Sequence, residues 1–315
     1  MVGAVAAVLA VPLLLATGVG YAAGRWWLAE VVGSLRPQYA IVLVVLGVLL
    51  AVTRRRATAI LCLSAVALNV APLAPLYLDR PAPAAAGAPV LDVMSLNVRI
   101  READVQALAG YLRGAEPDLV FLFATPPDVV TALRRAGVPY RIALAATPGV
   151  DLEIAVLTRL PVRRAEILPW GPTNRWNPVE VVVEFDSRDV HLLAIHPVSP
   201  WGGGRTRMRN EQLAAVGRWA AARQGSAVVV GDLNTVPWSP AFRSALQHGR
   251  LIDSQVGSGI QPSWPSVAGP LGLPIDHALH SRQLTTVRRS VGPGFGSAHR
   301  SVRVGLALAD RSGGG

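Results

Sequence analysis

The segment SAVVVGDLN, residues 226–234, places a run of valines directly before an aspartate, a leucine and an asparagine. A short apolar run of this kind, bounded by turn residues, is typical of a strand that is buried on both faces. Asp232 and Asn234 then stand at the downstream end of the strand, where α/β folds hold ligand-binding side chains at the mouth of a crevice. The segment therefore predicts a buried strand that carries polar side chains into a site.

The chain around this strand repeats the pattern of apolar strands and amphipathic helices. Further strands are predicted at 90–98, 117–124, 154–160, 179–185, 189–197, 274–281 and 301–308, and helices at 103–116 and 209–225. Strands in adjacent pairs, mixed with covering helices, indicate two mainly antiparallel sheets packed face to face, with the helices outside. We therefore predict one α/β domain over residues 90–309, followed by a disordered tail at 310–315.

The N-terminal part of the chain differs from this domain in composition. Residues 1–24, 37–53 and 57–78 contain no charged side chain, and the whole chain is 51% hydrophobic and only 16% charged. This composition excludes a disordered protein and an ordinary soluble enzyme. A spanning helix needs about 20 apolar residues, so the three runs predict three transmembrane helices within residues 1–78. A cleaved signal peptide is the alternative for the first run, although no Arg or Lys precedes its apolar stretch.

Three consecutive arginines predict the orientation of the chain. Arg54, Arg55 and Arg56 form the dense positive cluster near the predicted helices, and such clusters stay in the cytoplasm. The protein is then expected to be a multi-pass protein of the cell membrane, with everything after residue 78 on the outer face. The Pro- and Ala-rich segment 79–89 is expected to be a semi-rigid spacer between membrane and domain.

Charge and cysteine content narrow the possible partners. The formal net charge is +10, and the single cysteine, Cys62, allows neither an internal disulfide nor a CxxC zinc site. Basic residues are not interleaved with aromatic ones as in a dedicated nucleic-acid binder, so nucleic acid is not favoured, and anionic phosphates or membrane lipids are the expected partners. The Gly-rich segment 201–209 carries Arg205, Arg207 and Arg209 at alternating positions. We expect a loop there, which either folds over an anionic substrate or is simply solvated.

Seven short motifs follow one another along the predicted domain. They are SLNV (95–98), PDLVFL (117–122), IAVLTR (154–159), AIHPVSP (194–200), VVVGDLN (228–234), PIDHAL (274–279) and GSAHRSV (296–302). The ordered set resembles the endonuclease/exonuclease/phosphatase superfamily, and the succession GDLN, IDH and a terminal GS-x-HR is its specific part. The resemblance implies a four-layered α/β sandwich that hydrolyses phosphodiesters or phosphomonoesters, generally with Mg²⁺.

The resemblance also implies roles for the polar side chains at the strand ends. Hydrolysis of a phosphate ester needs an activated water, neutralisation of the phosphoryl charge and a proton for the leaving group. The implied set is His299 against the phosphate, Asp276 orienting it, Asp232 holding or deprotonating the attacking water, Asn234 and Asn97 donating to phosphoryl oxygens, and His196 as the second histidine. Glu153 is either the carboxylate that steadies His196 or a solvated strand-end residue.

Two positions depart from the family pattern, and both concern the metal. Ala124 stands where the family usually has a metal-binding Glu, and Ala298 where it usually has an Asp before the last His. The remaining ligands are Asn97 and Asp232. Because Mg²⁺ usually takes one or two carboxylates together with substrate phosphate, we expect these two residues to form only a weak Mg²⁺ or Mn²⁺ site. Three alternatives stay open: a weak metal assisted by the substrate, replacement of the cation by Arg99, or loss of catalysis.

The expected substrate follows from the layout of the chain. Three membrane helices before such a domain resemble a membrane subgroup linked to teicoplanin resistance, thought to act on polyprenyl (pyro)phosphates. We therefore expect an outward-facing hydrolase of a lipid-linked phosphate, with Asn97, Arg99 and Arg205 binding substrate. The alternatives are a secreted-type nuclease and a non-catalytic phosphate-binding or scaffold domain.

Overall fold

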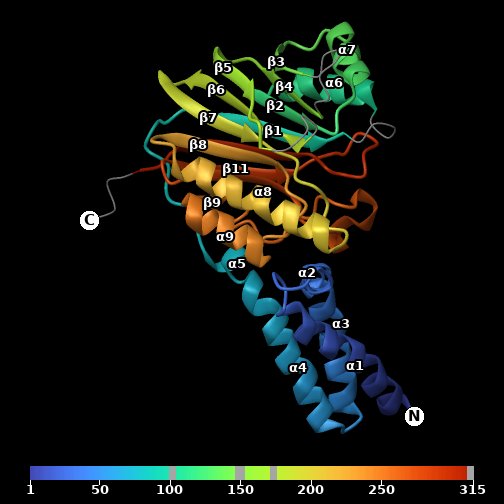
Figure 1. Cartoon of the computed structure of the whole chain (residues 1–315). Coiled ribbons are helices and arrows are strands. Elements are labelled where there is room, and N and C mark those ends of the chain that lie inside the picture. Colours follow the sequence, from blue (N-terminus) through green and yellow to red (C-terminus); the bar gives the residue numbers. More distant parts are fainter. Residues whose placement is uncertain (99–103, 146–152, 171–175, 311–315) are drawn as a thin grey trace.

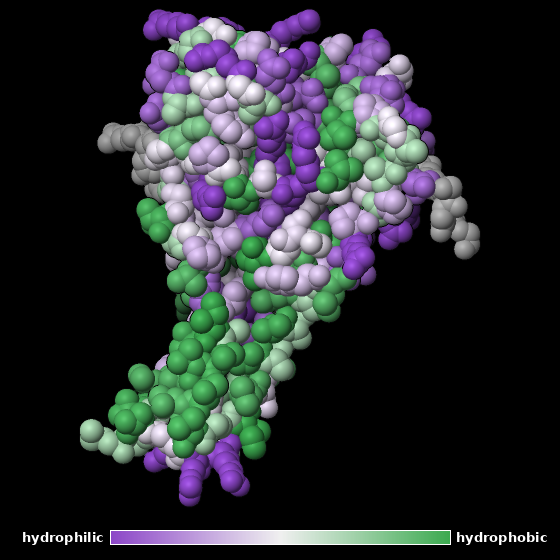
Figure 2. Space-filling model, turned by 180° about the vertical axis from the view of Figure 1, so that it is seen from behind, coloured by the Kyte–Doolittle hydropathy of each residue, from purple (hydrophilic) through white to green (hydrophobic). Residues whose placement is uncertain are grey.

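An apolar helical region is followed by an α/β domain in the computed structural model, which describes residues 1–98, 104–145, 153–170 and 176–310 (Figure 1). The helical region contains α1 (Val2–Gly20), α2 (Trp27–Ser34), α3 (Arg36–Val52), α4 (Arg56–Val70), the short 3-10 helix η1 (Ala71–Leu73) and α5 (Pro75–Leu78). Figure 2 shows hydrophobic side chains over the face of this region in view and hydrophilic ones at its far tip. Arg54 and Arg55 lie in the turn between α3 and α4, Arg56 begins α4, and all three are exposed.

The long helices of this region pack through small and apolar side chains. Ala10, Leu43 and Cys62 are fully buried between α1, α3 and α4. The Asn69 side chain donates a hydrogen bond of 2.8 Å to the hydroxyl of Thr17, which joins α4 to α1. The amide nitrogen of Asn69 is thereby bonded to a neighbouring helix inside the apolar bundle.

Two helices of the region are long and apolar enough to cross a membrane. They are Val2–Gly20 and Arg56–Leu73, whereas α2 and α3 are separated by a bend of 60° and count as a third span only if taken together. The predicted three transmembrane helices therefore reduce to two clear candidates. The sequence pattern does not predict α2, because Arg25 and Glu30 interrupt the apolar run there.

The α/β domain is built on two six-stranded sheets. The first has the order β11-β12-β1-β2-β4-β3, with β1 (Leu91–Asn97), β2 (Leu119–Phe123), β3 (Arg141–Leu144), β4 (Ile154–Thr158), β11 (Leu284–Val291) and β12 (Val302–Leu308). The second has the order β5-β6-β7-β8-β10-β9, with β5 (Val162–Ile167), β6 (Val179–Phe185), β7 (Arg188–Ala194), β8 (Ser226–Asp232), β9 (Leu251–Asp253) and β10 (Asp276–Ser281). Each sheet is antiparallel except for one parallel pair, β1 with β2 and β7 with β8.

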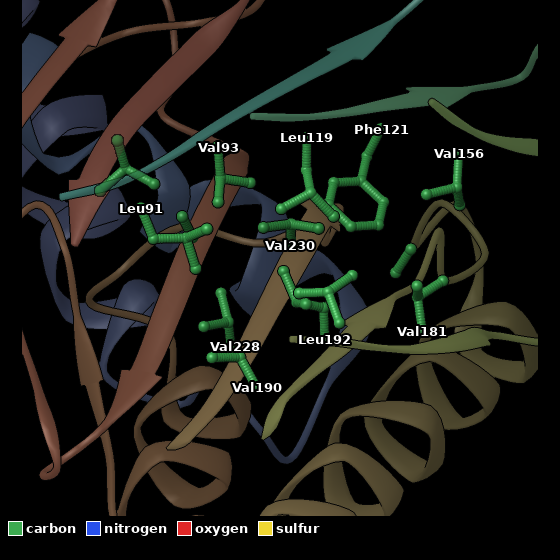
Figure 3. Close-up of a cluster of buried hydrophobic side chains, with 14 of the residues drawn as sticks. Leu91, Val93, Leu119, Phe121, Val156, Val181, Val190, Leu192, Val228 and Val230 are labelled. Atoms are coloured by element: carbon green, nitrogen blue, oxygen red, sulfur yellow. The ribbon is translucent and has the colours of Figure 1, made fainter. Parts of the chain in front are cut away.

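Apolar side chains hold the sheets and helices together in four layers. Between the sheets, Val93, Leu119 and Phe121 of the first sheet face Leu192 and Val230 of the second (Figure 3). The first sheet is covered by α6 (Val105–Ala115) and α7 (Pro127–Arg135), and the second by α8 (Gly203–Ala221) and α9 (Pro240–Gly249). The predicted sandwich of two sheets with outer helices is confirmed.

The segment 201–209, which the glycines suggest is a loop, differs from that expectation. Helix α8 begins at Gly203 and includes all three of its arginines. The helix starts there because Gly202 adopts a φ of 93° before it and the Thr206 hydroxyl donates back to the Pro200 carbonyl. A buried partner for Arg209, described below, fixes the first turns.

The segment 79–89 runs along the end of the first sheet. Ala84 forms an isolated bridge with Ala309, and the Ala85 N–H donates to the Leu308 carbonyl at 2.9 Å. The predicted tail beyond Asp310 lies outside the described residues.

Candidate active site

Polar side chains from both sheets meet at one edge of the sandwich. Asn97 ends β1, Asp232 ends β8, and Asp276, which begins β10, is paired in register with Asp232. His196 lies two residues after β7, and His299 three residues before β12. The parallel pairs β1/β2 and β7/β8 direct the carboxyl ends of these strands to this edge, so side chains far apart in the sequence become neighbours.

Asp232 lies at the centre of this group, which we call the catalytic cluster: Asp232, His196, His299 and Asp276. Its Oδ2 atom accepts a hydrogen bond of 2.9 Å from the Asn97 amide and lies 3.4 Å from His196 Nε2 and 3.7 Å from His299 Nε2. Burial favours the neutral acid, but the facing His299 and His196 hold the pKa of Asp232 well below its usual range. Asp232 is therefore a fixed negative charge at neutral pH.

His299 is oriented by Asp276, as the resemblance implies. The distance from His299 Nδ1 to Asp276 Oδ2 is 3.0 Å, and both side chains are buried. The His299 backbone N–H donates to the Ser297 hydroxyl, which itself donates to the Asn97 carbonyl. With Nδ1 held by Asp276, the Nε2 atom of His299 is directed at Asp232 and the space beside it.

His196 approaches Asp232 from the second sheet. Its Nδ1 atom is 3.8 Å from Glu153 Oε2, and its ring meets the edge of Phe123 at 6.3 Å between centroids. Burial disfavours the imidazolium, but the bond to Asp232 and the charges of Asp232 and Glu153 raise the pKa of His196 above its usual value. Glu153 thus lies where a carboxylate partner of His196 is expected, at a distance longer than a hydrogen bond.

Asn234 links the catalytic cluster to the helical region. Its backbone N–H donates to Asp232 Oδ1 at 3.0 Å, which its φ of 49° permits, and its side chain donates to the Pro197 carbonyl. Its own carbonyl accepts a bond of 2.7 Å from the guanidinium of Arg209.

Arg209 is in turn paired with Glu30 of α2. The distance from Arg209 Nη2 to Glu30 Oε1 is 2.7 Å, and both side chains are almost fully buried. Sequence reasoning missed this pair. The available signal was that Glu30 is the single acidic residue of the first 78, between apolar runs, where an ionisable side chain points to a specific partner.

Of the predicted substrate-binding arginines, the structure describes Arg205, which is not in the cluster. Arg205 is exposed on the first turns of α8 and donates from Nε to the Ser199 carbonyl at 3.0 Å. Arg205 thus stabilises the loop after His196. Arg99 lies outside the described residues.

Oxygen and nitrogen ligands for a metal ion are present but few. Asp232, Asp276 and His299 offer ligand atoms that lie within 4.8 Å of one another. The buried Oδ1 atom of Asn97 has no hydrogen-bond partner among the described residues, as expected of an atom that serves as a cation ligand. Ala124, at a φ of 49°, lies in the same cavity without a ligand atom. The residues fit a cation held by Asn97 and Asp232, with fewer carboxylates than Mg²⁺ usually takes.

The cluster opens into a cavity of about 950 Å³ between the domain and α2. Its lining includes His299, His196, Asp232 and other polar residues of the domain. It also includes apolar residues of the domain together with Glu30, Val31, Ser34 and Leu35 of the helical region. The helical region thus supplies one wall of the candidate active site.

The fold is that of a two-sheet α/β domain of the phosphoesterase- and nuclease-like type. Residues 94–299 match the model of the Endonuclease/Exonuclease/phosphatase family, and the chain belongs to this family.

Solved structures with the same fold agree with this assignment. The chain is similar to an endonuclease/exonuclease/phosphatase from Beutenbergia cavernae, with 22% identity, a TM-score of 0.56 and coverage of 70% of this chain and 72% of that one. A family protein from Bacteroides thetaiotaomicron has 15% identity, a TM-score of 0.57 and coverage of 71% and 97%. A humanized D. rerio TDP2 has 17% identity, a TM-score of 0.56 and coverage of 70% and 99%. No curated protein matches the chain.

Proposed function

We propose that this protein is a membrane-anchored phosphoesterase that hydrolyses a lipid-linked phosphate or pyrophosphate on the outer face of the membrane. The observation that carries the proposal is that the catalytic end of the domain packs on the apolar helical region. Arg209 pairs with Glu30, and the Trp238 indole donates to the Gly33 carbonyl at 2.9 Å. An active site in this position meets phosphates attached to lipids before it meets soluble ones.

The distribution of charge supports the outward orientation. The exposed arginines Arg54, Arg55 and Arg56 lie where α3 ends and α4 begins, and Figure 1 shows this junction at the end of the helical region that lies away from the domain. Because positive clusters stay in the cytoplasm, the domain at the opposite end is expected outside. The third span that this arrangement needs is the bent pair α2 and α3.

The catalytic cluster has the groups that phosphate hydrolysis needs. Asp232 is a weak proton acceptor because its pKa is low, so its role is to hold the attacking water and orient the histidines. His299, supported by Asp276, carries the proton. His196, with its raised pKa, donates to a phosphoryl oxygen as an imidazolium. The Asn97 and Asn234 amides add neutral donors at the same edge.

A divalent cation would be held by Asn97 Oδ1 and a carboxylate oxygen of Asp232. When bound, it would neutralise charge on the phosphoryl oxygens. With Ala124 beside it, we expect a weak site that depends on the phosphate itself for further ligands.

The two other functions are less well supported. A D. rerio TDP2 of the same fold has been solved in complex with a single-strand DNA product, and nucleic acid is thus a substrate class to test. Among the described residues that line the cavity, however, Arg209 is the only arginine, and it is paired with Glu30. A binding domain without catalysis would not need the Asp276–His299 pair.

Phosphate release from a short polyprenyl pyrophosphate tests the proposal. Full-length protein in detergent is assayed with Mg²⁺, with Mn²⁺ and with EDTA, beside the Asp232→Ala variant and with single-stranded DNA as a competing substrate. We expect metal-stimulated release that the variant lacks. Release equal to that of the variant under every condition refutes the proposal, and cleavage of DNA alone favours the nuclease.

A further inference from the structure

We propose that α2 and the loops opposite it form a subsite for the apolar chain of the substrate, next to the phosphate. This inference rests on the proposed function and goes beyond it, because it assigns substrate recognition to a helix of the N-terminal region. It also predicts which part of the substrate gives affinity: the chain segment nearest to the phosphate.

The wall of this subsite comes from both regions of the molecule. The helical region contributes Val31 of α2 and Leu35, the residue that directly follows this helix. The domain contributes Val236, Leu273 and Ile275. Val31, Leu35 and Leu273 are partly exposed to the cavity. Apolar side chains that stay partly exposed inside a cavity favour an apolar occupant.

Buried apolar contacts continue from the wall into the helical region. Val236 and Ile275 pack in one cluster with Leu73 and Leu76, which belong to η1 and α5 at the end of the α4 segment. The apolar part of the cavity wall therefore packs directly on the region that we propose is in the membrane.

Polar bonds fix α2 in its place as a wall. The Glu30 carboxylate accepts bonds from Arg209 at 2.7 Å, from the Ser239 hydroxyl at 2.6 Å and from the Gly24 N–H at 3.1 Å. Trp238 holds the Gly33 carbonyl one turn further along. The subsite is thus formed before substrate arrives, which lowers the entropy lost on binding.

The mixed lining of the cavity points to an occupant that is a single molecule with two chemistries. His299, His196 and Asp232 suit a phosphate, and the apolar side chains of the same cavity suit what is attached to it. A sugar or a base attached to the phosphate would leave its polar groups unpaired against Val31 and Leu35, which costs affinity. An alkyl or prenyl chain has no polar groups to leave unpaired there, and its burial removes apolar surface from water.

A chain-length series of alkyl phosphonates measures this subsite without hydrolysis. We would titrate methyl, butyl and hexyl phosphonate into the full-length protein in nanodiscs and determine each Kd by calorimetry. Burial of one methylene gives about a fourfold gain in affinity, so the Kd is expected to fall steeply from methyl to hexyl. Leu35→Asn is expected to remove most of this gain while leaving the Kd for methyl phosphonate within about twofold.

Two further variants control for damage to the fold. Val31→Phe narrows the subsite, so butyl phosphonate is expected to bind as in the wild type and hexyl phosphonate to lose its extra affinity. Val162→Asn introduces the same kind of polar change on β5, at a side chain that is 37% exposed and outside the cavity lining, and should leave the whole series unchanged.

Each outcome decides between the two proposals. A flat series in the wild type, or a gradient that Leu35→Asn and Val31→Phe leave intact, overturns the subsite. A gradient that these variants abolish supports it even if the protein releases no phosphate, in which case the proposed hydrolysis fails and the subsite remains.

Discussion

Two buried charge clusters lie on either side of Asn234, and they are satisfied to different degrees. In the first, Glu30 and Arg209 are 2.7 Å apart, and the Ser239 hydroxyl adds a bond of 2.6 Å. In the catalytic cluster, His196 and His299 lie 3.4 and 3.7 Å from Asp232. Glu30 has hydrogen-bond geometry with its partners, whereas the two histidines face Asp232 at distances just beyond it, and His299 bonds instead to Asp276 at 3.0 Å.

The difference separates a structural role from a chemical one. A buried pair that is completed by short bonds holds two segments together and has nothing left to offer a ligand. Side chains held near one another by longer contacts can still accept a phosphate, a water or a cation between them, and catalytic contacts often shorten only when the substrate is bound. Asn234 connects the two clusters, since its carbonyl accepts from Arg209 and its N–H donates to Asp232.

Removal of His299 is the strongest test of the chemical role. In His299→Ala we expect kcat to fall about 10³- to 10⁴-fold, because the proton carrier is lost. Phosphate release from a polyprenyl pyrophosphate measures this, and thermal unfolding should show a change of no more than about 2 kcal/mol. The matched control is His248→Ala, an exposed histidine on α9. Equal activity in His299→Ala and the wild type would remove the distinction between the clusters.

Removal of one charge from the Glu30–Arg209 pair tests the structural role. Glu30→Leu leaves the Arg209 charge buried without its partner, so the free energy of unfolding is expected to fall by about 3 to 5 kcal/mol. The double variant Glu30→Leu with Arg209→Met should regain most of this loss, since no uncompensated charge remains.

Denaturant titration of the protein in detergent checks the prediction, with Glu116→Gln as the control. Glu116 pairs with Arg159 at the surface, where both side chains are more than one-third exposed, and its loss should cost less than about 1 kcal/mol. If Glu30→Leu proves as mild as the control, the pair does not anchor α2.

The sequence predicts the catalytic cluster better than its surroundings. Motifs such as GDLN and IDH sit at strand ends, where polar side chains are expected to form a site. The register of β8 with β10 places Asp232 beside Asp276. The Glu30–Arg209 pair joins residues 179 positions apart in regions of different composition, and no local periodicity contains it. The glycines of 201–209 are likewise a local signal for a loop, whereas the Arg209–Glu30 contact within the observed helix is not visible in the local sequence.

A substitution at Ala124 can add the carboxylate that the proposed cation site lacks. Ala124 lines the cavity near the unpartnered Asn97 Oδ1, in a backbone conformation that already accommodates a side chain. Ala124→Glu adds the carboxylate that the family pattern has there, so the Mg²⁺ concentration for half-maximal activity is expected to fall about tenfold. Ala124→Gln, with nearly the same size and no charge, should give a much smaller change. An unchanged Mg²⁺ dependence in both variants would mean that the cation does not bind beside Asn97.

The smallest expected effect concerns Glu153, whose carboxylate is 3.8 Å from His196 Nδ1. Negative charge there favours the imidazolium and contributes to the raised pKa of His196, so Glu153→Gln should lower the titration midpoint of His196. The alkaline limb of kcat/KM, expected above pH 6.5 because charged His196 donates to the phosphate, should move down with it. NMR titration of the ring protons measures the midpoint, and the exposed Glu166→Gln serves as control. If the titration midpoint of His196 stays the same in Glu153→Gln, Asp232 alone sets the charge of His196. The 3.8 Å contact with Glu153 then has no electrostatic effect on the catalytic cluster.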